Sequence, residues 1–83
     1  MPIDFYIAAL YNWVRSDAFN EASYEASERV LDVELDILDY EYAHGLIAKC
    51  DVSPDYVAPS EVLTEAELKA RIIEALNEAG VQL

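Results

Sequence analysis

The sequence predicts a small all-α bundle of three main helices, to which residues 46–50 can add a short fourth one. Apolar residues recur every three or four positions in three segments, residues 2–15, 21–44 and 65–79, as they do on one face of an α-helix. The chain has only two glycines and three prolines, and they fall at the ends of these segments or between them. A length of 83 residues with 54% hydrophobic residues supports one packed core, so we expect a single domain over residues 1–83.

The first predicted helix, residues 2–15, is apolar on nearly all sides. Pro2 suits its first turn, where the missing N–H has no helical acceptor. One apolar stripe consists of Ile3, Ile7, Leu10 and Val14, and aromatic residues cover much of the rest: Phe5, Tyr6, Tyr11 and Trp13. We interpret this helix either as a buried central helix or as a self-association surface. A strand over residues 5–10 is the weaker alternative, because Ala8 and Ala9 favour a helix.

The second predicted helix follows a connection at residues 16–19, and Asn20 has the side chain of an N-cap. The helix then spans residues 21–44, and Gly45 ends it. Apolar residues flank its charged face on both sides, so we expect the helix to pack between two neighbours. Residues 33–37 also alternate as a half-buried strand does, and this alternative stays open. The helical period extends much further along the chain and favours the helix.

Six carboxylates of this second helix recur at spacings of 3 and 4, which places them on one helix face. They are Glu21, Glu25, Glu28, Asp32, Asp36 and Asp39. Glu34 and Glu41 add two more acids nearby, and Arg29, which can pair with Glu25, is the only base. Like charges at these spacings destabilise a helix by about 0.2–0.5 kcal/mol per pair. An unpaired acidic stripe is therefore typical of a surface that a basic partner neutralises, and the alternative is a stripe that serves solvation alone.

The last helix, residues 65–79, begins with a capping box in which Thr64 is the N-cap and Glu67 the third helical residue. Gly80 has the position of a C-terminal glycine stop. The apolar face of this helix consists of Leu68, Ile72, Ile73, Leu76 and Ala79. Two ion pairs are expected within the helix, Glu65 with Lys69 and Glu67 with Arg71.

The net charge of −12 argues against direct binding to nucleic acid or to an anionic membrane, because phosphates would repel the chain. It favours a basic protein partner instead. The longest apolar run, residues 5–11, is too short to span a membrane, and we expect no signal peptide. The single cysteine, Cys50, excludes an internal disulfide and suits a cytoplasmic location.

No motif for catalysis or for a cofactor stands out, so we expect a protein that is not an enzyme and needs no cofactor or metal. Glu41 and His44 have the Glu-x-x-His spacing of helical di-iron sites, but the chain has one histidine and only a symmetric dimer would supply the second copy. We interpret His44 as a helix-terminal residue near the negative end of the helix dipole. Cys50 has no base nearby except His44, and we interpret it as structural.

In size, acidity and helix content, and in the stripe from Glu21 to Asp39, the chain resembles the small acidic inhibitors that phages and mobile elements encode. These include DNA-mimic anti-restriction proteins and several anti-CRISPR proteins. The resemblance implies an inhibitor that occupies a nucleic-acid-binding surface of a host defence complex, in the cytoplasm of the host cell.

The predicted partner site consists of the stripe and its two neighbours: Glu21, Glu25, Glu28, Asp32, Glu34, Asp36, Asp39 and Glu41. We expect this site to bind the basic groove of a nucleic-acid-binding protein or complex. Two alternatives stay open. In one, the chain is an oligomerisation or adaptor module that forms a homodimer through its aromatic first helix. In the other, it is an antidote that binds a basic toxin through the same stripe.

Overall fold

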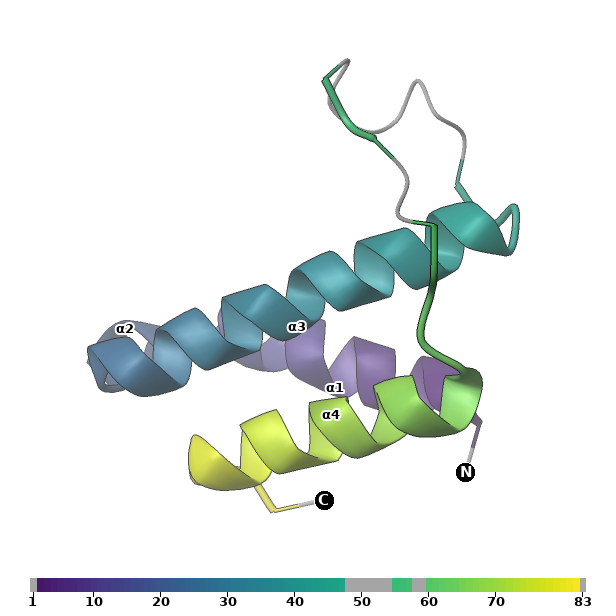
Figure 1. Ribbon diagram of the computed structural model, residues 1–83. Helices are drawn as coiled ribbons and strands as arrows, with labels where there is room; N and C mark the ends of the chain where they lie inside the picture. Colours follow the sequence, from purple (N-terminus) through teal and green to yellow (C-terminus); the bar gives the residue numbers. More distant parts are fainter. Residues whose placement is uncertain (1, 48–54, 58–59, 83) are drawn as a thin grey trace.

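The computed structural model describes residues 2–47, 55–57 and 60–82, and within them the backbone forms four α-helices and no strand (Figure 1). The helices are α1 (Ile3–Val14), α2 (Asp17–Glu21), α3 (Tyr24–Ala43) and α4 (Glu65–Glu78). The all-α prediction with three main helices is confirmed, and the short extra helix comes before α3. The strand alternatives for residues 5–10 and 33–37 are wrong, because both segments lie inside helices.

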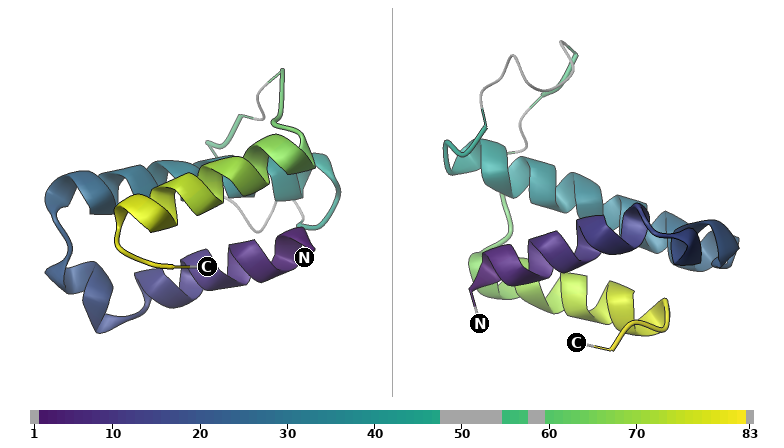
Figure 2. Two further views of the ribbon diagram at one scale, coloured as in Figure 1. Left: turned by 90° about the horizontal axis from the view of Figure 1, so that it is seen from below. Right: turned by 180° about the vertical axis from the view of Figure 1, so that it is seen from behind.

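The three long helices lie side by side, and α3 runs antiparallel to both α1 and α4 (Figure 1, Figure 2). α4 packs mainly on α3, and α1 contacts both of them. α2 lies at the end of the molecule where the chain turns from α1 into α3. Both long neighbours of α3 therefore cover the same half of its circumference.

One face of each long helix forms the core, as the spacing of the apolar residues predicts. In α1 the buried residues are Ile3, Ile7, Leu10 and Trp13, and in α3 they are Val30, Val33, Ile37 and Tyr40. α4 contributes Leu68, Ile72, Ala75 and Leu76. The predicted faces are confirmed with small shifts: Val14 and Ile73 are only partly buried, and Trp13 and Ala75 take the more buried places.

The chain leaves the helical conformation between α2 and α3, where the sequence predicts one continuous helix. Ala22 has an extended backbone with ψ 157°. The Ser23 side chain then accepts a hydrogen bond from a backbone N–H of the first turn of α3, at 3.2 Å. The predicted N-cap at Asn20 and the predicted helix start at residue 21 are therefore wrong, because a better-placed cap lies three residues later.

Residues 16–19 do not form the predicted connection, because α2 already begins after Ser16. The Ser16 hydroxyl donates a hydrogen bond to the Trp13 carbonyl at 2.6 Å. Phe19 packs edge to face on Trp13, with ring centroids 5.5 Å apart. This aromatic contact joins α2 to α1, and the chain turns at Ala22 before α3 starts.

The predicted glycine stops after α3 and α4 and the predicted start of α4 are confirmed. Gly45 and Gly80 have φ values of 71° and 90°, and after each of them an N–H donates to the carbonyl five residues earlier at 2.8 Å. At the start of α4 both hydrogen bonds of the Thr64–Glu67 capping box are present, at 3.1 and 3.2 Å. The further turn predicted at residues 46–50 lies mostly outside the described residues.

Candidate functional site

α3 carries most of the acids of the predicted partner site. Five of them lie on its exposed side, on the flank that borders α4, and we call these five the acidic ridge. The acidic ridge consists of Glu25, Glu28, Asp32, Asp36 and Asp39. At 1.5 Å of rise per residue the ridge is about 21 Å long, with about 5 Å of helix axis between neighbouring charges.

Glu21 does not belong to the ridge, although the sequence predicts that it does. It is the last residue of α2, and the extended backbone at Ala22 separates it from α3. The regular spacing from Glu21 to Glu25 therefore does not correspond to one helix face.

Glu34 and Glu41 lie on the other flank of α3, next to α1. Their charges act on the Tyr11 phenol of α1, whose pKa is raised by burial first and then by Glu41 and Glu34. The pKa of Glu41 is itself raised, by burial and by the nearby Asp4 of α1. Glu34 and Glu41 thus form a second acidic group, separate from the ridge.

Two ridge acids have partners on other parts of the chain. The Arg71 guanidinium of α4 donates to the Asp36 carboxylate at 3.2 Å, and the Asp36 side chain is only 28% exposed. The Tyr56 hydroxyl donates to Asp39 at 2.5 Å, and this bond raises the pKa of Tyr56 to about 12. The half of the ridge near the C-terminus of α3 is therefore partly neutralised or hydrogen-bonded.

The other three ridge acids, Glu25, Glu28 and Asp32, are exposed. Among the residues that the structure describes, no cationic group lies within 4.0 Å of their carboxylates. The predicted relief of Glu25 by Arg29 is wrong, because Arg29 reaches across to α4 and pairs with Glu78 at 2.5 Å. The N-terminal half of the ridge thus has no direct ion pair among the described residues.

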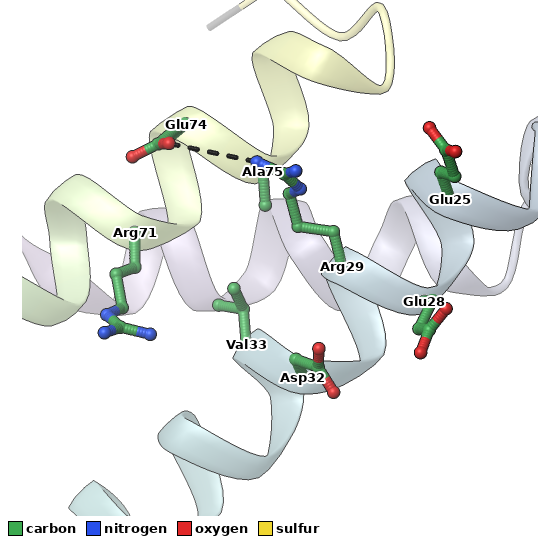
Figure 3. Close-up of a pocket in the computed structure, with 8 residues that line it drawn as sticks. All are labelled: Glu25, Glu28, Arg29, Asp32, Val33, Arg71, Glu74 and Ala75. Atoms are coloured by element: carbon green, nitrogen blue, oxygen red, sulfur yellow. Dashed lines mark ion pairs between the residues drawn. The ribbon is translucent and has the colours of Figure 1, made fainter.

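A groove of about 580 Å³ separates this half of the ridge from α4 (Figure 3). Val33 and Ala75 are the apolar residues of its lining, and charged side chains surround them. The charged residues are Glu25, Glu28, Arg29, Asp32, Arg71 and Glu74, and a 4.0 Å ion pair joins Arg29 to Glu74 across the groove. The groove therefore carries both signs of charge, with acids in excess.

Neither ion pair predicted within α4 forms at 4.0 Å or less. Arg71 pairs with Asp36 of α3, and its charge contributes to the lowered pKa of Glu67 only after the hydrogen bonds with Thr64. The Lys69 ammonium lies 4.9 Å from the centroid of the Tyr6 ring. Both bases turn toward neighbouring helices because those helices offer partly buried partners. The sequence predicts unpaired acids on α3 and internally paired charges on α4. This difference is smaller than expected, because Arg71 of α4 pairs with an acid of α3.

Most of the aromatic residues of α1 are buried or partly buried. Trp13 is 8% exposed and belongs to the core, and Tyr6 and Tyr11 are partly buried. Phe5 is 43% exposed, with its ring edge to face on Tyr6 at 5.3 Å. The self-association surface that the sequence suggests on α1 thus reduces to Phe5.

A second groove, of about 360 Å³, lies on the flank of α3 that borders α1. Its lining consists of Tyr11, Leu31, Asp32, Glu34, Leu35 and Leu38, and we call it the apolar groove. The side chains of Leu31 and Leu35 are 43% and 62% exposed. The sequence predicts a packed flank at these leucines, and for Leu31 and Leu35 this is wrong, because the buried face of α3 consists of Val30, Val33, Ile37 and Tyr40.

His44 is the C-cap of α3, as the sequence predicts. Its Nδ1 lies 2.9 Å from the Tyr40 carbonyl, to which it donates, and its ring stacks on Tyr40 with centroids 4.1 Å apart. The described part of the chain contains no group of three or more His, Cys, Asp and Glu residues that could hold a metal ion. Cys50 lies outside the described residues.

None of the helices in the described ranges is both long and apolar enough to cross a membrane. Comparison with protein-family models gave no matching family, and comparisons with curated proteins and with solved structures gave no match either. The acidic ridge and the apolar groove are the two surface features of the described residues that point to a partner.

Proposed function

We propose that this protein is a non-enzymatic inhibitor that binds a basic, nucleic-acid-binding protein through the acidic ridge of α3. The observation that carries the proposal is the set of three adjacent, exposed carboxylates without a cationic partner among the described residues, Glu25, Glu28 and Asp32. Each neighbouring pair of these acids destabilises α3 by about 0.2–0.5 kcal/mol. A partner with lysines and arginines at matching positions would remove this repulsion on binding.

The spacing of the ridge supports competition with nucleic acid. Its charges follow one another at about 5 Å along the helix axis, and phosphates follow one another at about 3.4 Å along one DNA strand. A groove that binds a phosphate backbone therefore presents cations at a similar density. The resemblance in composition to phage-encoded inhibitors favours a host defence complex as the partner, and a basic toxin would use the same ridge.

The experiment is capture of partners by the immobilised protein from a bacterial lysate at low salt. We expect the captured protein to be released by raised NaCl and by a short duplex DNA, because both compete for the same cations. A captured protein that elutes with salt but never with DNA would contradict a nucleic-acid-binding surface. Its identity, a toxin or a component of a defence complex, decides between the two kinds of partner.

Two double variants with the same change in net charge test the ridge itself. Glu28→Lys with Asp32→Lys reverses the ridge, and Glu34→Lys with Glu41→Lys reverses the other flank of α3. Each variant moves the net charge from −12 to −8, since each reversal adds two charge units. We expect the first to abolish capture and the second to retain it, with unchanged helix content by circular dichroism. Equal loss in both variants would mean that net charge alone attracts the partner.

A second candidate function, a dimerisation module that uses α1, is favoured by one observation, the 43% exposure of Phe5. Its test is sedimentation velocity at low and at high salt. A dimer that persists in both conditions and is lost in Phe5→Ser would favour this function over the ridge. Trp13 is unsuitable as a probe of this interface, because its substitution would damage the core.

A further inference from the structure

The apolar groove exposes two leucines of α3 to solvent. Leu35 is 62% exposed and Leu31 43% exposed, and Leu38 and Tyr11 complete the apolar lining. On an α-helix Leu31, Leu35 and Leu38 follow one another at spacings of four and three, so they form one continuous stripe about 10 Å long. The stripe therefore has the length and periodicity that two turns of another helix would match.

The rim of this groove is acidic. Asp32 and Glu34 are part of its lining, and Glu41 acts on Tyr11 from the same flank of α3. Arg15 is the base that acts on Tyr11, so the acids outnumber the bases around the groove. An occupant with cations beside its apolar side chains would be attracted, and one with carboxylates would be repelled.

A second copy of this chain fits the groove poorly on the same grounds. Two copies related by a two-fold axis would bring the acids of one rim against the same acids of the other. The net charge of −12 on each copy adds to this repulsion.

We propose that the apolar groove is a docking site for an amphipathic, basic α-helix of a partner protein. Apolar side chains at i, i+4 and i+7 of that helix contact Leu31, Leu35 and Leu38, and lysines or arginines on its flanks face Asp32 and Glu34. The site is distinct from the proposed function, since it needs apolar contacts that the ridge does not offer. Asp32 alone belongs to both surfaces.

The probe is a helical peptide of about 14 residues with leucines at i, i+4 and i+7 and lysines on both flanks. One control peptide has the same composition in scrambled order, and another has glutamates in place of the lysines. We expect saturable binding of the first peptide by calorimetry, at a salt concentration near 0.15 M, where exposed charges more than about 8 Å apart are largely screened. Binding of the scrambled peptide with equal affinity would overturn the proposal, because it would show charge attraction alone. Equal binding of the glutamate peptide would overturn the basic character of the partner.

Site variants locate the contact. Leu35→Ser removes the most exposed leucine and leaves the core untouched, and we expect peptide affinity to fall at least about tenfold, which corresponds to about 1.4 kcal/mol. Glu25→Gln with Glu28→Gln neutralises two ridge acids outside the apolar groove, and we expect a change of less than about threefold. The amide NMR spectrum should shift around residues 31–38 when peptide is added. Unchanged affinity in Leu35→Ser, or shifts confined to the groove between α3 and α4, would overturn the proposal.

Sedimentation of the free protein tests the competing occupant. We expect a monomer at the concentrations used for peptide binding. A dimer that dissociates in Leu35→Ser would show that a second copy occupies the groove, and would overturn the assignment to a basic helix.

Discussion

Tyr56 hydrogen-bonds one of the ridge carboxylates. It lies in the segment between α3 and α4, and its hydroxyl donates a hydrogen bond to Asp39 at 2.5 Å. Its ring contacts Tyr42 edge to face, with centroids 5.3 Å apart. The hydrogen bond holds the phenol in its protonated form beside a carboxylate. Asp39 thus receives a hydrogen bond from the described part of the connecting segment, and Glu25, at the opposite end of the ridge, is exposed.

This hydrogen bond predicts an alkaline titration. The pKa of Tyr56 is raised from 10.0 to about 12, first by the hydrogen bond to Asp39 and then by burial and by nearby charge. Because the folded pKa is the higher one, the stabilisation is complete below pH 10.0 and is lost as the pH rises through about 12. We expect Asp39→Ala to return the Tyr56 titration toward 10.0, measured as phenolate absorbance after subtraction of a Tyr56→Phe titration.

Asp36→Ala is the matched control for this measurement, because Asp36 lies on the same ridge and pairs with Arg71 instead of Tyr56. The Tyr56 titration should be the same in this variant as in the unmodified chain. A shift of equal size in both variants would mean that the summed charge of the ridge, and not the hydrogen bond, raises the pKa.

At the scale of the elements, α4 and α3 differ in how far the sequence determines them. α4 was predictable at both ends because its signals are local: the Thr64–Glu67 capping box and Gly80 act within one turn. The start of α3 was not, because several N-cap residue types lie close together there. Ser23 is the signal that could have shown the start of α3, because its side chain caps the first turn. The Ser16 side chain makes no cap hydrogen bond and donates to the Trp13 carbonyl instead.

The ion-pair partners of the charged residues could not be predicted from the sequence, because they depend on how the helices pack. Asp36 and Arg71 are 35 residues apart, and only the packing of α4 on α3 brings them together. The same holds for the exposed leucines of α3. Their spacing predicts a buried flank, but which face of α3 is buried depends on where α1 and α4 pack against it.

The capping box gives a prediction for α4. Thr64→Ala removes the side-chain oxygen that accepts the Glu67 N–H, and we expect the free energy of unfolding to fall by about 1 kcal/mol. Thr64→Ser keeps the oxygen and should lose much less. Urea unfolding followed by circular dichroism measures both. A loss in Thr64→Ser as large as in Thr64→Ala would assign the effect to the threonine methyl group and not to the cap.

For the whole molecule, charge opposes compactness. The chain has 17 acids and 5 bases within a principal-axis extent of 32 × 28 × 18 Å, so repulsion acts across the entire surface. We expect the urea midpoint to rise when NaCl increases from about 0.01 M to about 0.1 M, as the Debye length shortens from about 30 Å to about 10 Å. The variant Glu28→Lys with Asp32→Lys should respond less to salt. A midpoint that falls with salt would mean that the ion pairs of Arg29 and Arg71 outweigh the repulsion.

Trp13 has a consequence for the turn between α1 and α3. It is the only tryptophan of the chain, and its ring touches Phe19 of α2. α2 has no buried residue, and Phe19 and Ala22 pack only partly buried against the core, so α2 is the described helix most prone to local opening. Detachment of α2 would expose the Trp13 indole to solvent while the three long helices stay packed. The fluorescence emission maximum of Trp13 therefore reports the detachment of α2. This signal can be separated in time from the global unfolding of the three long helices.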